Sequence, residues 1–140
     1  MEKTKKYKIT GTSHYIKNIL SLKSENPDYD LTKKEMVDEG YENDRIYQYS
    51  FYVVKFELEP EPTNHYDPNA IKVLADGVHI GYIKSGSCKH LLKAIQDNKI
   101  VKIDGDIYGG KYKYLGYDEY EEKYYLDKGE NEYKADLIII

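Results

Sequence analysis

The stretch from residue 61 to residue 84 reads EPTNHYDPNAIKVLADGVHIGYIK and decides the fold class. Its first part, residues 61–69, contains prolines at 62 and 68 and follows another at 60. Proline fixes φ and lacks an N–H donor, so this part cannot join a regular sheet. We therefore predict an ordered loop over residues 61–69.

The second part of this stretch predicts a β-hairpin. Residues 71–75 and 78–83 are rich in β-branched and apolar side chains, which favours two strands. The dipeptide Asp76-Gly77 between them suits a type I′ turn. A two-residue turn makes three cross-strand pairs on one apolar face. These pairs are Ala75 with Val78, Val73 with Ile80, and Ile71 with Tyr82.

Outside the hairpin, the sequence predicts further strands and two short helices. The predicted strands cover residues 51–58, 100–108, 111–115 and 133–140, and one broken strand covers 7–12 and 15–22. Gly109-Gly110 is predicted to form a turn. Thr32 and Glu35 have the spacing of a capping box, which predicts a helix over residues 33–38.

A second helix is predicted from Ser87 to about residue 98, with Leu91, Leu92 and Ile95 as its apolar stripe. With five or six strands and no repeat, the chain reads as one mostly β (α+β) domain over residues 1–140. It would be a small antiparallel barrel or sheet with added helices.

The composition constrains both core and location. The chain has 17 Tyr, no Trp and two Phe, so tyrosines must supply much of the core, half-buried with the hydroxyl at the surface. One Cys excludes an intramolecular disulfide framework and fits a reducing compartment. No apolar run reaches the roughly 20 residues of a membrane span. We expect a cytoplasmic protein without a membrane partner.

The net charge of −4 is strongly segmented along the chain. Residues 1–23 carry six Lys and one Glu, and residues 1–8 are predicted to form a flexible basic arm. Residues 62–116 carry eight Lys and five Asp. The acidic residues concentrate in two predicted insertions, 24–44 and 118–132. The basic middle part of the chain therefore contains the proline-braced loop.

Polar residues crowd this loop. Asn64, Tyr66, Asp67 and Asn69 lie directly before a predicted buried strand. Asn64 and Asn69 are equally well explained by Asx turns, in which the side chain bonds its own backbone. A ring beside a fixed carboxylate, as in Tyr66 and Asp67, suits a site that stacks a base or sugar and accepts hydrogen bonds from hydroxyls.

The run EPTNHYDPNAIKV, followed by the hairpin and GYIK, resembles the HIRAN domain, found in eukaryotic fork-remodelling DNA translocases and as stand-alone bacterial and phage proteins. The resemblance covers about residues 58–95. It implies a small OB-like antiparallel β-barrel of about six strands with two short helices. In eukaryotic members the pocket holds the 3′ end of single-stranded DNA.

Carried onto this sequence, the resemblance implies that Asp67 accepts from a terminal 3′-hydroxyl and that Tyr66 stacks on a base. Asn64 would shape the loop and reach the end nucleotide, and Asn69 would hold the turn. Lys84 would contact a phosphate. In the family's first strand an Arg precedes two aromatics; here these positions fall on Ser13, His14 and Tyr15, so only Tyr15 fits. The missing Arg could be replaced by His14, by Lys17 or by the lysines at positions 3, 5, 6 and 8.

The sequence therefore predicts a non-catalytic module for single-stranded DNA ends, active in DNA repair or replication, with no cofactor and no metal. The spacing of His79, Cys88 and His90 lacks the second pair of a zinc site, and no nucleophile triad or phosphate loop occurs. The alternative is a protein-interaction module, in which the acidic segments bind a basic DNA-processing protein and the DNA pocket is vestigial.

Overall fold

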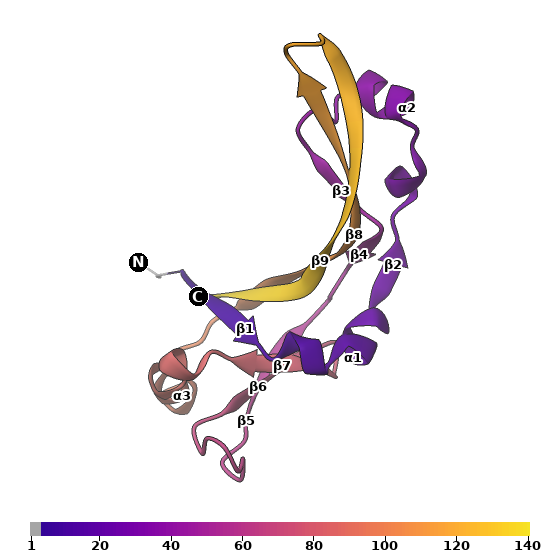
Figure 1. Cartoon of the computed structure of the whole chain (residues 1–140). Coiled ribbons are helices and arrows are strands. Elements are labelled where there is room, and N and C mark those ends of the chain that lie inside the picture. Colours follow the sequence, from indigo (N-terminus) through magenta and orange to yellow (C-terminus); the bar gives the residue numbers. More distant parts are fainter. Residues whose placement is uncertain (1–3) are drawn as a thin grey trace.

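Seven antiparallel strands form the main sheet in the computed structural model, which describes residues 4–140 (Figure 1). Their order is β3-β8-β9-β1-β7-β6-β5. Their bounds are β1 Lys5–Thr10, β3 Arg45–Tyr47, β5 Phe56–Pro60, β6 Ile71–Ala75, β7 Val78–Ile83, β8 Ile103–Asp118 and β9 Lys123–Ile139. A two-stranded sheet pairs β2 (Lys23–Glu25) with β4 (Tyr49–Phe51).

Three short helices accompany the sheets. They are α1 (Ile16–Leu20), α2 (Lys33–Asp38) and α3 (Cys88–Gln96). Three 3-10 turns, η1 (Thr12–His14), η2 (Pro27–Asp30) and η3 (Ser85–Ser87), connect elements. The predicted α+β class, rich in strands, is therefore confirmed.

The predicted closed barrel of about six strands is not what the described residues form. Within residues 4–140 the edge strands β3 and β5 do not pair with each other, so the sheet is open. Strands β8 and β9 are 16 and 17 residues long, and they extend well past the other strands as a bent hairpin (Figure 1). The far part of β8 pairs with β3 at residues 112–114, while β5 lies at the opposite edge of the sheet.

The predicted turn at Gly109-Gly110 is wrong, because β8 runs through both glycines. A register shift against β9 lies between Tyr108 and Gly110. A Cβ at Gly109 would clash with the backbone of β9, and one at Gly110 would clash with the ring of Tyr133. These glycines therefore allow a close approach of two strands, and the chain reverses later, between β8 and β9.

The hairpin β6–β7 confirms its predicted turn and corrects its predicted register. Asp76 (φ 48°) and Gly77 (φ 80°) both have positive φ, and Ala75 pairs with Val78. One extra residue in β7 then shifts the pairing to Val73 with Gly81 and Lys72 with Tyr82. The predicted pairs Val73 with Ile80 and Ile71 with Tyr82 are therefore wrong, because β7 has a bulge.

Two predicted strands are also corrected. Residues 16–20 form α1, since Ile16, Ile19 and Leu20 also have the i, i+3, i+4 spacing of a helix face, and Ile19 is fully buried. The predicted strand 51–58 is interrupted between Phe51 and Phe56. There the Asp76 carboxylate accepts the N–H groups of Val54 and Lys55, which holds these residues in a loop.

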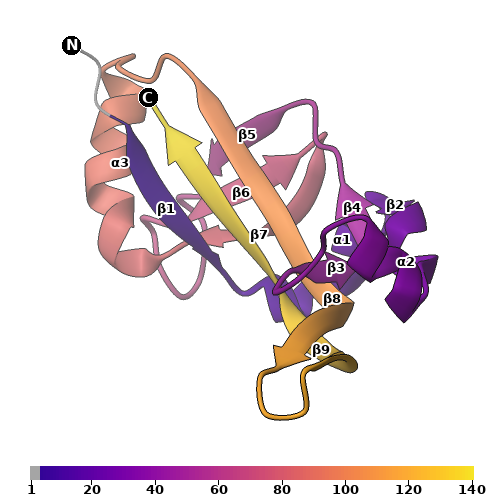
Figure 2. The same cartoon turned by 90° about the horizontal axis from the view of Figure 1, so that it is seen from above.

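Both predicted helices are confirmed. Thr32 Oγ1 accepts from Glu35 N at 3.2 Å and Glu35 Oε1 accepts from Thr32 N at 3.1 Å, which completes the capping box of α2. Helix α3 buries Cys88 and Leu91. It lies beside β1 (Figure 2), where Lys5 Nζ meets His90 Nε2 at 2.8 Å.

The basic arm is only partly described. Residues 5–8 belong to β1 and pair with β9, whereas residues 1–3 lie outside the described residues. The acidic segment 24–44 contains η2 and α2, and 118–132 contains the hairpin turn and the first part of β9.

Two apolar clusters stabilise the fold. The larger cluster joins α1 and α3 to β1, β5, β6 and β7, and to the first part of β8 and the last part of β9. It is centred on Ile71, Ile80 and Leu137. The smaller cluster packs Met36 of α2 against Ile46 of β3 and Leu115 of β8, in the part of the β8–β9 hairpin near its turn. As expected, most of the 17 tyrosines are half-buried, and Tyr7 is 8% exposed. None of the helices in residues 4–140 has the length and apolar character of a membrane span.

Candidate nucleic-acid interface

The proline-braced loop is closed by its own hydrogen bonds. Glu61 N donates to Ala70 O at 2.8 Å, which joins the two ends of the loop. Asn64 Oδ1 accepts from the backbone N–H groups of Tyr66 (2.9 Å) and Asp67 (3.0 Å). The Asx-turn interpretation therefore holds for Asn64, and it leaves the loop fixed in shape.

Asp67 occupies a half-buried position at the base of this loop. Its Oδ1 accepts from Asn69 N at 2.8 Å, while Oδ2 has no hydrogen-bond partner among residues 4–140. The carboxylate also lies near the first residue of α3. Burial raises the pKa of the Cys88 thiol, and the charge of Asp67 raises it further. One carboxylate oxygen therefore orders the turn and the other is available to a ligand.

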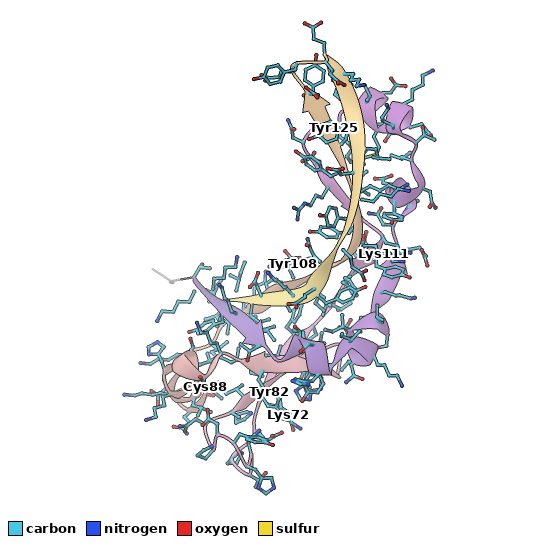
Figure 3. All side chains as sticks on the ribbon, viewed as in Figure 1. Lys72, Tyr82, Cys88, Tyr108, Lys111 and Tyr125 are labelled. Atoms are coloured by element: carbon cyan, nitrogen blue, oxygen red, sulfur yellow. The ribbon has the colours of Figure 1, made fainter. Side chains whose placement is uncertain are left out.

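Glu61 connects the loop to the sheet. Its carboxylate pairs with Lys72 Nζ at 2.9 Å and accepts from Asn64 Nδ2 at 2.8 Å and from the Tyr82 hydroxyl at 3.2 Å. The Lys72 contact is the main cause that lowers the pKa of Glu61. Lys72 and Tyr82 are cross-strand partners and lie close together below the bend of the molecule (Figure 3).

Tyr82 belongs to an aromatic cluster with Tyr15 and His79. The ring centroids of Tyr15 and His79 are 4.1 Å apart, those of His79 and Tyr82 are 4.9 Å apart, and those of Tyr15 and Tyr82 are 6.2 Å apart. Burial raises the pKa of Tyr82, and the neighbouring phenol of Tyr15 adds to the effect. Burial also lowers the pKa of His79, whose Nε2 contacts Gly81 O at 2.9 Å.

The β7 bulge explains why this cluster exists. In a regular strand, residues 79 and 82 would face opposite sides of the sheet. The extra residue lets Ile80 and Ile83 both face the core, while His79 and Tyr82 share the outer face. The bulge therefore positions the two rings against which Tyr15 packs.

The other predicted site residues differ in their surroundings. The Tyr66 side chain is 98% exposed at the loop tip. His14 ends η1 and is exposed. Lys84 is exposed directly after β7, where its N–H donates to Lys8 O at 3.2 Å and its carbonyl lies 3.6 Å from Cys88 Sγ. Lys84 therefore lies near the end of the loop that carries Asp67.

Comparison with known families decides the classification. The model of the HIRAN domain matches residues 6–115 of the 140-residue chain. The chain belongs to the HIRAN domain family. No curated protein and no solved structure matches the chain. Membership makes this protein a nucleic-acid-binding module, and the match includes the loop, the β6–β7 hairpin and α3.

This HIRAN domain assembles part of the predicted site. Asn64, Asp67 and Asn69 meet within the loop, Lys84 lies near them beside Cys88, and Tyr15 reaches them through Tyr82 and Glu61. The stretch that the sequence predicts in place of the family's Arg motif includes the 3-10 turn η1, in which Ser13 and His14 are exposed. The chain's single Arg, Arg45, lies in β3 instead.

Sequence reasoning missed four contributors to the candidate site: Glu61, Lys72, His79 and Tyr82. Glu61 and Lys72 lie on either side of the loop motif at residues 64–70, and their opposite charges could have indicated an ion pair. His79 and Tyr82 could be placed on one face only with knowledge of the bulge. Among residues 4–140 no group of three His, Cys, Asp or Glu side chains is arranged to hold a metal ion.

Proposed function

We propose that this HIRAN domain binds the 3′ end of single-stranded DNA at the loop formed by residues 61–70, without catalysing a reaction. The observation that carries the proposal is the hydrogen bonding of the two Asp67 carboxylate oxygens. Its Oδ1 is held by Asn69 N at 2.8 Å, and among the described residues its Oδ2 has no hydrogen-bond partner. A fixed carboxylate oxygen of this kind accepts from a terminal hydroxyl and repels a terminal phosphate.

Neighbouring side chains supply the other contacts that an end nucleotide needs. Tyr66 extends an exposed ring beside Asp67, on which the terminal base stacks. Lys84 and Lys8, which are exposed and joined through a backbone hydrogen bond, neutralise the phosphates that follow. Tyr15 and Asn64 support the site through Tyr82 and Glu61, and His14 on η1 is a further polar contact.

The phosphate contacts are few, because the family's Arg position falls on Ser13 here. Single-strand affinity therefore depends weakly on salt, with a slope of log K against log salt concentration of about −1 to −2. We expect recognition of the end to come mainly from the hydroxyl and the base.

The test uses fluorescent tetrathymidylates that end in a 3′-hydroxyl or a 3′-phosphate, titrated with the whole chain at low salt. Wild-type protein should prefer the hydroxyl. Asp67→Asn keeps an acceptor for Asn69 N but removes the charge, so it should abolish the preference. Asp97→Asn, an exposed carboxylate after α3, is the matched control and should keep it. Equal affinities for both ends in the wild type would contradict the proposal.

A second function, binding of a basic DNA-processing protein, has one observation in its favour. The hairpin turn carries Tyr120, which is fully exposed, among Glu119, Glu121 and Glu122. This acidic tip lies at the far end of the molecule from the loop between β5 and β6 (Figure 1). Pull-down of a basic partner that is lost on charge reversal at the tip, without any DNA binding, would favour this function.

We also propose a cytoplasmic location in a DNA repair or replication process. The free, buried Cys88 suits a reducing compartment, and DNA ends are the substrates that such processes produce.

A further inference from the structure

The inner side of the bent β8–β9 hairpin carries a surface that we call the tyrosine platform, made of Arg45, Tyr47, Tyr112, Tyr114 and Tyr125. The strand register defines it. Arg45 pairs with Tyr114 and Tyr47 pairs with Tyr112, so all four face one side. The alternate residues Ile46 and Leu115 face the other side and are buried against Met36.

Two of these rings lie flat on the sheet. Tyr112 is the cross-strand partner of Gly129, and Tyr125 is the partner of Gly116. A Cβ on either glycine would overlap the ring of its tyrosine partner, so each ring covers its glycine. Each ring therefore has one face against the backbone. The other face of Tyr125 is directed outward, and this side chain is 41% exposed, whereas the other face of Tyr112 is covered by Arg45.

Hydrogen bonds and a cation hold the platform in place. The Arg45 guanidinium lies 4.6 Å from the centroid of the Tyr112 ring, whose centroid is 5.9 Å from that of Tyr47. The Tyr114 hydroxyl donates to Asn43 Oδ1 at 3.2 Å, and Asn131 Nδ2 donates to the Tyr47 hydroxyl at 3.4 Å. Rings that are already fixed lose little conformational entropy when a ligand stacks on them.

Two adjoining clefts connect the platform to the neighbourhood of the candidate site. The first, of about 550 Å³, is lined by Lys84 and Lys8 at one end and by Tyr108 and Lys134 at the other. The second, of about 510 Å³, is lined by the same Tyr108 and Lys134, and by Arg45. Tyr108 lies on the inner side of the bend (Figure 3), and its hydroxyl donates to Asp136 Oδ2 at 3.0 Å.

The side chains along these clefts carry a small net positive charge, which favours an anionic strand held through few phosphate contacts. Five basic side chains line them: Lys6, Lys8, Lys84, Lys134 and Arg45. Three carboxylates oppose them: Glu130, Glu132 and Asp136. One of these, Asp136, is already engaged by Lys6 at 3.6 Å and by the Tyr108 hydroxyl. The clefts are therefore net basic in a chain whose net charge is −4.

We infer that the single strand leading away from the bound 3′ end runs through these two clefts and stacks its bases on the tyrosine platform. Unpaired bases expose the π-faces that flat rings bind, whereas a duplex does not. Four of the five platform residues lie within the family match, whereas Tyr125 and Gly129, the glycine under Tyr112, lie in residues 116–140, which the match does not include. This inference rests on the proposed function for the direction of the strand.

The test measures how affinity changes with strand length, using the whole chain and 3′-hydroxyl oligonucleotides dT4 and dT16. Wild-type protein should bind dT16 at least fivefold more tightly than dT4, since each stacked base is worth about 5- to 150-fold. Tyr125→Ala and Arg45→Ala should each remove much of this gain and leave dT4 affinity unchanged. Tyr120→Ala, at the exposed hairpin turn, is the matched control and should keep the gain.

A further oligonucleotide separates the contribution of base stacking from that of phosphate electrostatics. An oligonucleotide of four thymidines at the 3′ end, preceded by twelve abasic units, has the same phosphates as dT16 and keeps their contacts with the basic clefts, but it should lose most of the length gain. The inference is overturned if this strand binds as tightly as dT16, or if the platform variants keep the full gain.

The outcomes also separate this inference from the proposed function. Equal affinities for dT4 and dT16, with dT4 binding still dependent on Asp67, would overturn the platform alone. A length gain that needs Tyr125 but not Asp67 would support the platform and overturn end recognition. Failure of wild-type protein to bind either strand would overturn both.

Discussion

The Tyr82 hydroxyl donates to Glu61 Oε1 across 3.2 Å and so ties strand β7 to the loop that carries Asp67. Lys72 and Asn64 meet the same carboxylate at 2.9 and 2.8 Å. Glu61 therefore holds together the three parts of the candidate site: the hairpin, the aromatic cluster and the loop.

Replacing Glu61 by Gln should weaken DNA-end binding without unfolding the protein. Gln keeps the size of the side chain, and its amide oxygen can accept from Tyr82 and Asn64 as Oε1 does. The charge that pairs with Lys72 is lost, and the amide nitrogen that takes the place of Oε2 cannot accept from Lys72. We expect about a tenfold loss of affinity for a 3′-hydroxyl oligonucleotide, which corresponds to one charge-assisted hydrogen bond. Fluorescence anisotropy measures it. Glu59→Gln, an exposed neighbour in β5, should bind like wild type, and equal affinities for all three proteins would contradict the role of Glu61.

His79 should make stability depend on pH. Burial lowers its pKa in the folded protein, whereas the unfolded chain regains a value of about 6.5. Between these two values the unfolded chain binds more protons than the folded chain, so the free energy of unfolding increases with pH and decreases on acidification below about pH 6.5. Urea unfolding between pH 5 and 8 measures this slope.

The variant His79→Gln should flatten this part of the pH profile. Gln can still donate to Gly81 O but does not titrate. The exposed His65 provides the matched control, because His65→Gln should keep the wild-type slope. Identical profiles for His79→Gln and wild type would show that another group causes the effect.

A methyl group at Gly81 should disturb the β7 bulge. A Cβ there would lie 2.6 Å from Ile9 Cγ2 and 2.7 Å from the carbonyl oxygen of Thr10. The backbone oxygen cannot move without breaking the pairing of β1 with β7, so Gly81→Ala should lower the free energy of unfolding by about 1–3 kcal/mol. Thermal unfolding measures it. Gly86→Ala, where a Cβ meets no atom within 4 Å, should change stability little.

Loss of the capping box should destabilise α2. Thr32→Ala removes the side-chain acceptor for Glu35 N and should cost about 0.5–2 kcal/mol of the free energy of unfolding. Lys34→Ala, on the exposed surface of the same helix, controls for the change to Ala. If chemical denaturation gives the two variants equal stability, the cap contributes nothing.

Local chemistry made several elements predictable from sequence. The capping box of α2, the Asp76-Gly77 turn and the apolar stripe of α3 depend on residues a few positions apart, and all three are confirmed. The glycines at 109 and 110 misled the prediction. Their role is close approach to β9, a contact with residues more than 20 positions away, and no local pattern distinguishes it from a turn.

The same limit applies to the candidate site. The sequence brought together Asn64, Asp67 and Asn69, because one loop carries them. It missed the aromatic cluster, since one extra residue in β7 decides which side chains share a face with Tyr15. The tyrosine-rich stretch 108–125 is evident in the sequence, but the arrangement of its rings is not, because it depends on cross-strand partners that pair Tyr112 with Gly129 and Tyr125 with Gly116.

The central claim is that Asp67 recognises a terminal 3′-hydroxyl, and the most direct measurement is the ratio of dissociation constants for 3′-phosphate and 3′-hydroxyl tetrathymidylates. With one charge-assisted hydrogen bond lost and repulsion added, wild-type protein should give a ratio of about ten or more, and Asp67→Asn a ratio near one. A ratio near one for the wild type, or an unchanged ratio for Asp67→Asn, would contradict the claim.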